Sequence, residues 1–283
     1  MPIYKAPLRD MRFILDEVFN ASAVWSSLPA LAEHVDRDVV DAILEEAAKF
    51  NEQVVFPLNR SGDEEGAQFS NGVVTTPAGF KEAFAQYGEG GWIGLGADPR
   101  WGGQGMPKMV TVMTEEIIFG ANPSFALYPL LGIGAALAMS QHASDELNDR
   151  YLPKIYSGEW SGTMCLTEPH AGTDLGIIRS KAEPQADGSY NISGTKIFIT
   201  GGEHDLASNI IHLVLAKLPD APAGSKGISL FLVPKFLVNE DGSVGERNAV
   251  TCGSIEHKMG IKASSTCVMN FDSARGWLVG QVN

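Results

Sequence analysis

The sequence contains few cysteines, few positive charges and no long uninterrupted apolar run. Its three cysteines are odd in number and lack metal-type spacing, which argues against a disulfide framework and predicts reduced, buried thiols: Cys165, Cys252 and Cys267. Basic residues number 21 against 34 acidic ones, for a net charge of −13. Nucleic acid is therefore excluded as a partner, because binding its phosphates needs a basic face. A phosphorylated cofactor is not excluded, since a few local donors can hold one.

The sequence shows no targeting signal and no membrane span. The first ten residues lack the apolar core of a secretory signal. The most apolar stretch, residues 125–139, is shorter than the ~18 residues that a spanning helix needs. Pro129, Gly132 and Gly134 interrupt it, so it predicts a buried helix. Together with the cysteine usage, this predicts a cytoplasmic protein.

The first half of the chain has helical periodicity. Over residues 36–57, apolar side chains recur at helical spacing and Asp36 stands where an N-cap is needed. Pro77 fits the first turn of a helix that reaches Tyr87. Further helices are expected over residues 8–19, 108–119, 124–141 and 144–157.

From about residue 160 the segments become short and rich in β-branched and aromatic residues, with frequent Gly, Pro, Asn and Asp between them. Asp187-Gly188 is a hairpin signal. Strands are expected over residues 161–166, 177–183, 190–200, 210–217, 227–233, 250–257 and 266–271. The pattern predicts an α+β multidomain chain, with an all-α helical N-terminal domain over residues 1–159 and an antiparallel β-barrel-like or sandwich domain over residues 160–283.

Two short motifs in the second half carry the strongest functional signal. Residues 164–175 read Met-Cys-Leu-Thr-Glu-Pro-His-Ala-Gly-Thr-Asp-Leu, and residues 196–202 read Lys-Ile-Phe-Ile-Thr-Gly-Gly. Each motif ends a β-type segment on a Thr and then passes into a turn rich in Gly or Pro. Such turns bring backbone N–H groups and hydroxyls close to a ligand, because Gly allows backbone geometry that a Cβ would block.

At these motifs the chain resembles the acyl-CoA dehydrogenases, flavoproteins that oxidise acyl-CoA thioesters. The first motif matches the family signature from Cys165 to Asp174. One departure follows, because Ile177 stands where the family has a small residue and Gly176 comes one position earlier. Residues 198–200 match an aromatic, an aliphatic residue and a Ser or Thr.

Weaker blocks keep the family's order along the chain. They cover residues 99–105, 258–266 and 277–280. Residues 202–205 and 218–226 resemble one branch of larger acyl-CoA dehydrogenases, which includes the 3-methylmercaptopropionyl-CoA dehydrogenase-like proteins. Because all the blocks between residues 99 and 280 follow the family's order, chance is a poor explanation of the resemblance.

The resemblance implies FAD as the cofactor. Met164 and Leu166 would lie against the flavin edge, and Thr167 would donate a hydrogen bond to the pyrimidine side. Thr173 would face the pyrophosphate of the cofactor or the acyl-CoA chain of the substrate. It is therefore a candidate for binding either ligand. No residue for a metal ion is implied.

The second motif would hold the reactive part of the flavin. Phe198 would pack on a flavin face, Ile199 would continue the same contact, and Thr200 would place its hydroxyl near N5, the hydride-accepting atom. Hydride transfer needs this close, oriented contact, and a donor near N5 stabilises the reduced flavin.

The implied reaction is α,β-dehydrogenation of an acyl-CoA thioester with hydride transfer to flavin N5. It needs a carboxylate base held in a desolvated place. In the family the base is a Glu or Asp of a C-terminal helical bundle, while Glu168 belongs to loop structure. The catalytic base is therefore unknown here and expected beyond Asn283, so the isolated chain is expected to be inactive. A fragment of a larger enzyme is favoured over a natural short form.

The resemblance also implies partners and a pathway. These are acyl-CoA as substrate, electron-transfer flavoprotein as electron acceptor, and a homodimer or homotetramer active in fatty acid β-oxidation. Two alternatives stay open: a non-catalytic flavin- or acyl-CoA-binding scaffold, and an acyl-CoA oxidase. The floor of the acyl pocket is expected from residues 125–131 and from the missing bundle.

Other chemistries fail on their residues. Gly94-Leu-Gly96 does not continue as the G-x-G-x-x-G of a dinucleotide-binding unit. Glu203-His204-Asp205 could suggest a metal, but three adjacent side chains do not converge on one ion, so a solvated turn is expected. Ser161-Gly162 lacks the G-x-S-x-G elbow of hydrolases.

Overall fold

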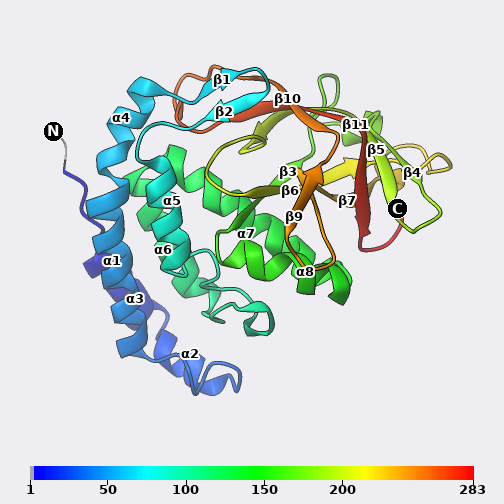
Figure 1. The fold of residues 1–283 in the computed structure, drawn as a ribbon. Helices are drawn as coiled ribbons and strands as arrows, with labels where there is room; N and C mark the ends of the chain where they lie inside the picture. The colour runs from blue at the N-terminus through cyan, green and yellow to red at the C-terminus, as the bar shows by residue number, and fades with distance from the viewer. Residues whose placement is uncertain (1–2) are drawn as a thin grey trace.

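In the computed structural model, which describes residues 3–283, a helical part lies beside a β part (Figure 1). The helical part runs from the N-terminus to the start of the sheet. Its elements are α1 (Leu8–Phe13), η1 (Ile14–Val18), α2 (Ala21–Ser27), α3 (Arg37–Phe50), η2 (Asn51–Val55), α4 (Pro57–Glu65), α5 (Phe80–Glu89), η3 (Pro99–Trp101), α6 (Lys108–Ala121), α7 (Pro123–His142) and α8 (Asp145–Tyr156).

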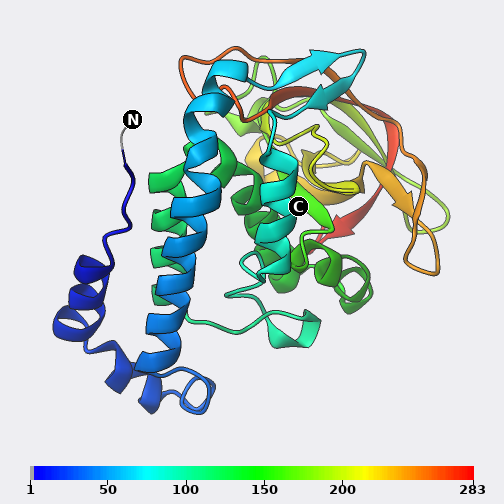
Figure 2. The same ribbon diagram turned by 60° about the vertical axis from the view of Figure 1, so that its left-hand side comes forward.

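A long helical rod forms one side of the helical part (Figure 2). It starts at α3, where the Asp36 side chain accepts a hydrogen bond from the Val39 N–H, as its predicted role as N-cap requires. The π turn η2 then carries the rod into α4, with the Phe56 N–H bonded to the Asn51 carbonyl at 2.8 Å. The π turn falls directly before Pro57, which has no N–H to continue the regular pattern.

Helix α7 is the central helix between the two parts. The helix expected over residues 124–141 is confirmed, because α7 runs for 20 residues and continues through Pro129. By length and composition it could cross a membrane, but half of it is buried in the fold. Small residues allow α7 to pack closely on the sheet. Gly162 of β3 faces Ala135 of α7, and a Cβ on Gly162 would lie 2.8 Å from the Ala135 Cβ. Helix α7 is thus a core helix of this fold.

The β part is a seven-stranded sheet with two short hairpins. The sheet order is β3-β6-β7-β11-β5-β4, with β10 paired to β11. The elements are β3 (Trp160–Cys165), η4 (Leu175–Ile177), β4 (Lys181–Pro184), β5 (Tyr190–Thr200), β6 (Asn209–Ala216), η5 (Ser225–Gly227), β7 (Ser229–Pro234), β8 (Phe236–Val238), β9 (Val244–Arg247), β10 (Val250–Ile255) and β11 (Thr266–Val279).

The sheet differs from the expected antiparallel barrel-like domain in one pairing direction. Strands β3 and β6 are parallel, from the pair Trp160–Asn209 to the pair Cys165–Val214. The sheet curls, so that a parallel bridge joins Lys181 of β4 to Lys217, just after β6. Strand periodicity cannot reveal pairing direction, because both directions share the same alternation of side chains.

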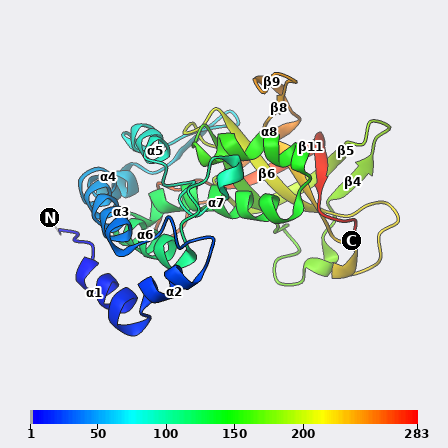
Figure 3. The same cartoon turned by 90° about the horizontal axis from the view of Figure 1, so that it is seen from below.

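Several predicted boundaries also change. Residues 177–180 lie outside the strand expected at 177–183, because the η4 turn comes first and β4 begins at Lys181. Strand β11 extends to Val279, well past its expected end. The hairpin of β8 and β9 was not expected, and it projects from the body of the protein (Figure 3). The three cysteines are free and buried, as expected.

A second unexpected hairpin belongs to the N-terminal half of the chain. Its strands are β1 (Gln68–Ser70) and β2 (Val73–Thr75), with Asn71 and Gly72 at positive φ between them. Asn-Gly is a strong hairpin signal that the helical reading of this half overlooked. The hairpin packs Val74 into the apolar core of the β part, so the two halves of the sequence share one core there.

We predict that Val74→Ala lowers the free energy of unfolding by about 2 kcal/mol, because it leaves a cavity in that shared core. Val73, the residue before Val74 in β2, is 54% exposed, while Val74 is 0% exposed. Val73→Ala is therefore the matched control and should change stability by less than about 0.5 kcal/mol. Urea unfolding of the two variants measures both values, and equal losses would contradict the packing of the hairpin.

Candidate flavin-binding site

The two sequence motifs meet at the ends of β3 and β5. The Ile197 N–H of β5 donates a hydrogen bond to the carbonyl of Thr167, just after β3, at 2.9 Å. This contact brings Thr167 next to the residues that precede Thr200. Both threonines are half-buried, and neither hydroxyl is hydrogen-bonded to another group within residues 3–283. Met164 and Leu166 are also half-buried.

Phe198 has the most unusual geometry of the predicted site residues. Its φ of +59° lies in the left-handed region, which is rare for an aromatic residue. The pairing of β5 with β11 slips at this point, between the pairs Ile199–Cys267 and Lys196–Met269. A bulge of this kind re-aims a side chain, and here it leaves the Phe198 ring 54% exposed. Backbone strain of this kind is concentrated at functional sites.

Ile199 lies differently from its neighbours. Its side chain is 2% exposed and belongs to the apolar core of the β part. The expected flavin contact of Ile199 is therefore limited to its backbone. Alternation along the strand explains the difference, because successive side chains point to opposite faces.

The loop after Thr167 is held in a tight turn. Glu168 and Ala171 exchange two backbone hydrogen bonds, of 2.9 and 3.0 Å. The exposed Thr173 follows at the outer part of the loop. Its neighbour Asp174 accepts a hydrogen bond from the Gly176 N–H at 2.9 Å. Thr173 is thus an exposed residue of the loop that begins at Thr167.

The departure from the family signature at Ile177 is explained by the same loop. A Cβ on Gly176 would lie 3.2 Å from the Gly224 Cα and 3.4 Å from the Ser225 N. Gly176 therefore occupies the position where only a small residue fits. Ile177 is exposed, so its size meets no restriction there.

A buried ion pair fastens the two motifs together. The Lys196 Nζ lies 2.9 Å from the Glu168 Oε1 and donates to the Leu166 carbonyl at 3.1 Å. Lys196 comes from the second motif and the other two residues from the first. The Lys196 side chain is 0% exposed and that of Glu168 is 3% exposed. Buried charges of this kind are retained only when they are paired and hydrogen-bonded.

Both oxygens of Glu168 are occupied within the loop. They accept from the Arg179 N–H at 2.7 Å and from the Ser180 N–H and hydroxyl at 3.0 and 2.6 Å. Burial acts to raise the pKa of Glu168, but the hydrogen bonds from Ser180, Arg179 and Lys196 outweigh it, so the pKa lies below its usual value. Glu168 is therefore a charged acceptor that shapes the loop, in agreement with its expected structural role, and it is a poor proton acceptor.

The turn after Thr200 contradicts the expected solvated turn. Glu203 and His204 are each only 2% exposed. Their side chains, with that of Asp205, point to three different partners. Glu203 is paired with Lys235, His204 contacts the Ser161 hydroxyl at 2.8 Å, and Asp205 accepts from Thr76. These three residues do not converge, and residues 3–283 contain no group of three or more acidic, Cys or His side chains that could hold a metal.

His204 and Ser161 do not form a nucleophile and base. The Leu206 N–H donates to the His204 Nδ1 at 3.1 Å, so the ring hydrogen is on Nε2 and donates to Ser161. Burial lowers the pKa of His204 to about 3. The imidazole is thus a neutral donor, which cannot take a proton from the hydroxyl.

The expected floor of an acyl pocket is only partly available on α7. Phe125 is fully buried in the core of the helical part, whereas Leu127, Leu130 and Leu131 are half-exposed. Further along α7, a cavity of about 210 Å³ lies against α6 and the loop after α5. Its apolar lining includes Trp92, Leu95, Ile133, Leu137 and Tyr156.

Comparison with known proteins gives the family of this fold. Residues 38–159 match the acyl-CoA dehydrogenase N-terminal domain, and residues 163–274 match the acyl-CoA dehydrogenase middle domain. The structure is similar to that of butyryl-CoA dehydrogenase from Megasphaera elsdenii, with a TM-score of 0.69 and 25% identity over 88% of this chain and 60% of that chain. An acyl-CoA dehydrogenase from Bacillus anthracis, solved in complex with FAD, shares the fold with a TM-score of 0.70 at 24% identity, over 88% of this chain and 38% of that chain.

The chain belongs to the acyl-CoA dehydrogenase family and contains the N-terminal and middle domains of that family. It is 48% identical to 3-methylmercaptopropionyl-CoA dehydrogenase from Ruegeria pomeroyi, over 99% of this chain and 47% of that protein. It is 43% identical to a butyryl-CoA dehydrogenase from Syntrophomonas wolfei, over 98% of this chain and 46% of that protein. The chain thus spans about half the length of these curated relatives.

We predict that Lys196→Ala lowers the free energy of unfolding by about 3–5 kcal/mol, because it leaves the Glu168 carboxylate buried without its ion pair. The double variant Lys196→Met with Glu168→Gln should recover part of that loss, since neither partner is then charged. Lys181→Ala, at an exposed position of β4, is the control. Chemical unfolding measures the stability of all three variants. If Lys196→Ala were as stable as the control Lys181→Ala, the importance of the pair would be refuted.

We predict that stability falls on mild acidification because of two buried histidines. Burial lowers the pKa of His204 and of His212 from 6.5 to about 3. Their contribution is complete above pH 6.5 and is lost as the pH falls toward 3, because the unfolded chain takes up protons that the folded chain refuses. His204→Gln should reduce this pH dependence between about pH 7 and about pH 5, whereas His34→Gln, at an exposed position, should not. A native stability that is flat over this range contradicts the prediction.

Proposed function

We propose that the chain binds FAD at the meeting point of its two motifs and acts in the α,β-dehydrogenation of an acyl-CoA thioester. The observation that carries this proposal is the bulge that turns the Phe198 ring outward beside two unpaired threonine hydroxyls. An exposed aromatic ring and nearby hydroxyls suit a flat, heteroatom-rich ring system. Family membership supports the same cofactor.

Each residue of the site has a distinct task in this proposal. Phe198 packs on one face of the flavin and excludes water from it. Thr200 directs its hydroxyl toward N5, and Thr167 directs its hydroxyl and N–H toward the pyrimidine edge. Met164 and Leu166 border the ring, while Thr173 contacts the pyrophosphate or the acyl-CoA. The bound flavin supplies the hydride acceptor for the reaction.

The acyl group is proposed to lie along α7. Its half-exposed residues Leu127, Leu130 and Leu131 offer an apolar path toward the cavity bordered by Leu137. The α-proton needs a base, and Glu168 is unsuited because both its oxygens are already hydrogen-bonded. Glu168 is therefore not proposed as the base, and the family resemblance implies a Glu or Asp of a C-terminal helical bundle for that role.

The wider biology belongs to the same proposal. The acyl-CoA thioester is the substrate, electron-transfer flavoprotein takes the electrons, and the working form is a cytoplasmic homo-oligomer that serves β-oxidation. The similarity to 3-methylmercaptopropionyl-CoA and butyryl-CoA dehydrogenases favours a short acyl group.

We predict that the purified chain binds FAD and that Phe198→Ala and Thr200→Val each weaken binding about 10-fold, through lost stacking and a lost hydrogen bond. Thr251→Val is the control, because Thr251 is an exposed threonine of β10. Titration with FAD, followed by flavin absorption and fluorescence, gives the dissociation constants. A folded native chain that binds no FAD, or a control that loses as much as Thr200→Val, would contradict the proposed site.

A further inference from the structure

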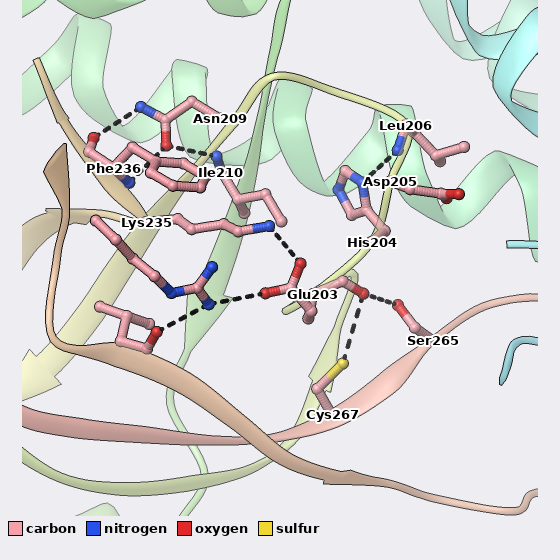
Figure 4. A network of polar contacts seen from close by, with 12 residues as sticks. Glu203, His204, Asp205, Leu206, Asn209, Ile210, Lys235, Phe236, Ser265 and Cys267 are labelled. Atoms are coloured by element: carbon pink, nitrogen blue, oxygen red, sulfur yellow. Dashed lines mark hydrogen bonds and ion pairs between the residues drawn. The ribbon is translucent and has the colours of Figure 1, made fainter. Parts of the chain in front are cut away.

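The turn that follows Thr200 is anchored by buried charges (Figure 4). The Glu203 side chain points into a cluster formed by two cations from other strands. Lys235, just after β7, donates a hydrogen bond from its Nζ to the Glu203 Oε1. Arg247 ends β9, and its Nη2 lies 3.5 Å from the Glu203 Oε2. The ring of Phe236 is near both cations, 5.4 Å from the Lys235 Nζ and 5.5 Å from the Arg247 guanidinium carbon.

The backbone of the turn is also fixed to Ser265, the residue just before β11. The Glu203 carbonyl accepts a hydrogen bond from the Ser265 hydroxyl at 2.9 Å, and the Gly201 N–H donates to the Ser265 carbonyl at 2.9 Å. A Cβ on Gly202 would lie 2.8 Å from the Met269 Sδ. The turn is therefore pressed against β11 with no room for a larger residue.

This anchoring lies close to Thr200 in the chain. Only Gly201 and Gly202 separate Thr200 from Glu203, and Gly201 has a φ of +63°. Glycine restricts its backbone less than any other residue, so two of them in succession do not fix the direction of the chain by themselves. On its other side Thr200 is fixed by its pairing with Thr266. Glu203 is the first anchored side chain on the open side.

We propose that Glu203 is a positioning residue for Thr200. Its carboxylate, held by Lys235 and Arg247, fixes the Gly201-Gly202 turn and thereby the direction of the Thr200 hydroxyl. A buried ion pair is often no more stabilising than an apolar replacement, so stability alone does not account for a buried carboxylate with two cations. A fixed orientation of Thr200 does. The flavin part of this inference rests on the proposed function, whereas the fixed turn does not.

The first test needs no cofactor. Glu203→Gln keeps the size of the side chain and removes its charge. Amide hydrogen exchange at Gly201 and Gly202 should become about 10- to 100-fold faster, the equivalent of one lost hydrogen bond to a charged group. The control is Asp187→Asn, which removes the ion pair with Arg275 far from the turn and should leave these amides unchanged. Unchanged exchange in a folded Glu203→Gln variant would overturn the proposal.

The second test asks whether Glu203 acts through Thr200. The native chain, Glu203→Gln, Thr200→Val and the double variant are loaded with FAD, and the flavin midpoint potential and visible spectrum are recorded. Glu203→Gln should shift both in the direction of Thr200→Val, and the double variant should match Thr200→Val alone. Additive shifts would mean that Glu203 acts independently of Thr200, which contradicts the inference while leaving the flavin site intact. If the native chain binds no FAD, the proposed function fails, and the exchange measurement still decides whether Glu203 fixes the turn.

Discussion

The buried pair of Glu168 and Lys196 is the interaction on which the candidate site depends. It joins the two motifs, and its members are sequence neighbours of the candidate site residues: Glu168 follows Thr167, and Lys196 stands two residues before Phe198. Because Lys196 also binds the Leu166 carbonyl, the end of β3 and the end of β5 cannot separate without leaving a buried charge unpaired. The arrangement of Thr167 and Phe198 is therefore set by the fold before any ligand binds, which lowers the ordering cost of binding.

A second junction connects this site to the helical part. The Tyr128 hydroxyl of α7 donates to the Ala263 carbonyl at 2.9 Å and accepts from the Ser265 N–H at 2.8 Å. Ser265 in turn binds the carbonyl of Glu203. The helix along which the acyl group is proposed to lie is thus joined by hydrogen bonds to the turn that follows Thr200. One polar network holds both halves of the proposed reaction site in register.

Local features of the structure could be predicted from the sequence, and non-local ones could not. The N-cap at Asp36 and the bounds of β5 follow from side-chain chemistry and alternation within a few residues. The parallel pairing of β3 and β6 depends on how distant strands meet, which alternation does not encode. The burial of Glu203 could not be predicted from the sequence for a related reason. It depends on Lys235 and Arg247, which are more than thirty residues away along the chain. The candidate site residues Thr167, Phe198 and Thr200 could be proposed from the sequence because each stands in a motif whose residues are contiguous.

The most direct measurement is a crystal structure of the protein with FAD bound. We expect the flavin ring to pack against Phe198, with the hydroxyls of Thr167 and Thr200 at hydrogen-bond distance of about 3 Å from it. We also expect the pair of Glu168 and Lys196 to keep the contact seen without the cofactor. A flavin bound elsewhere, or a flavin site that forms only after this pair has separated, would contradict the central role of the pair.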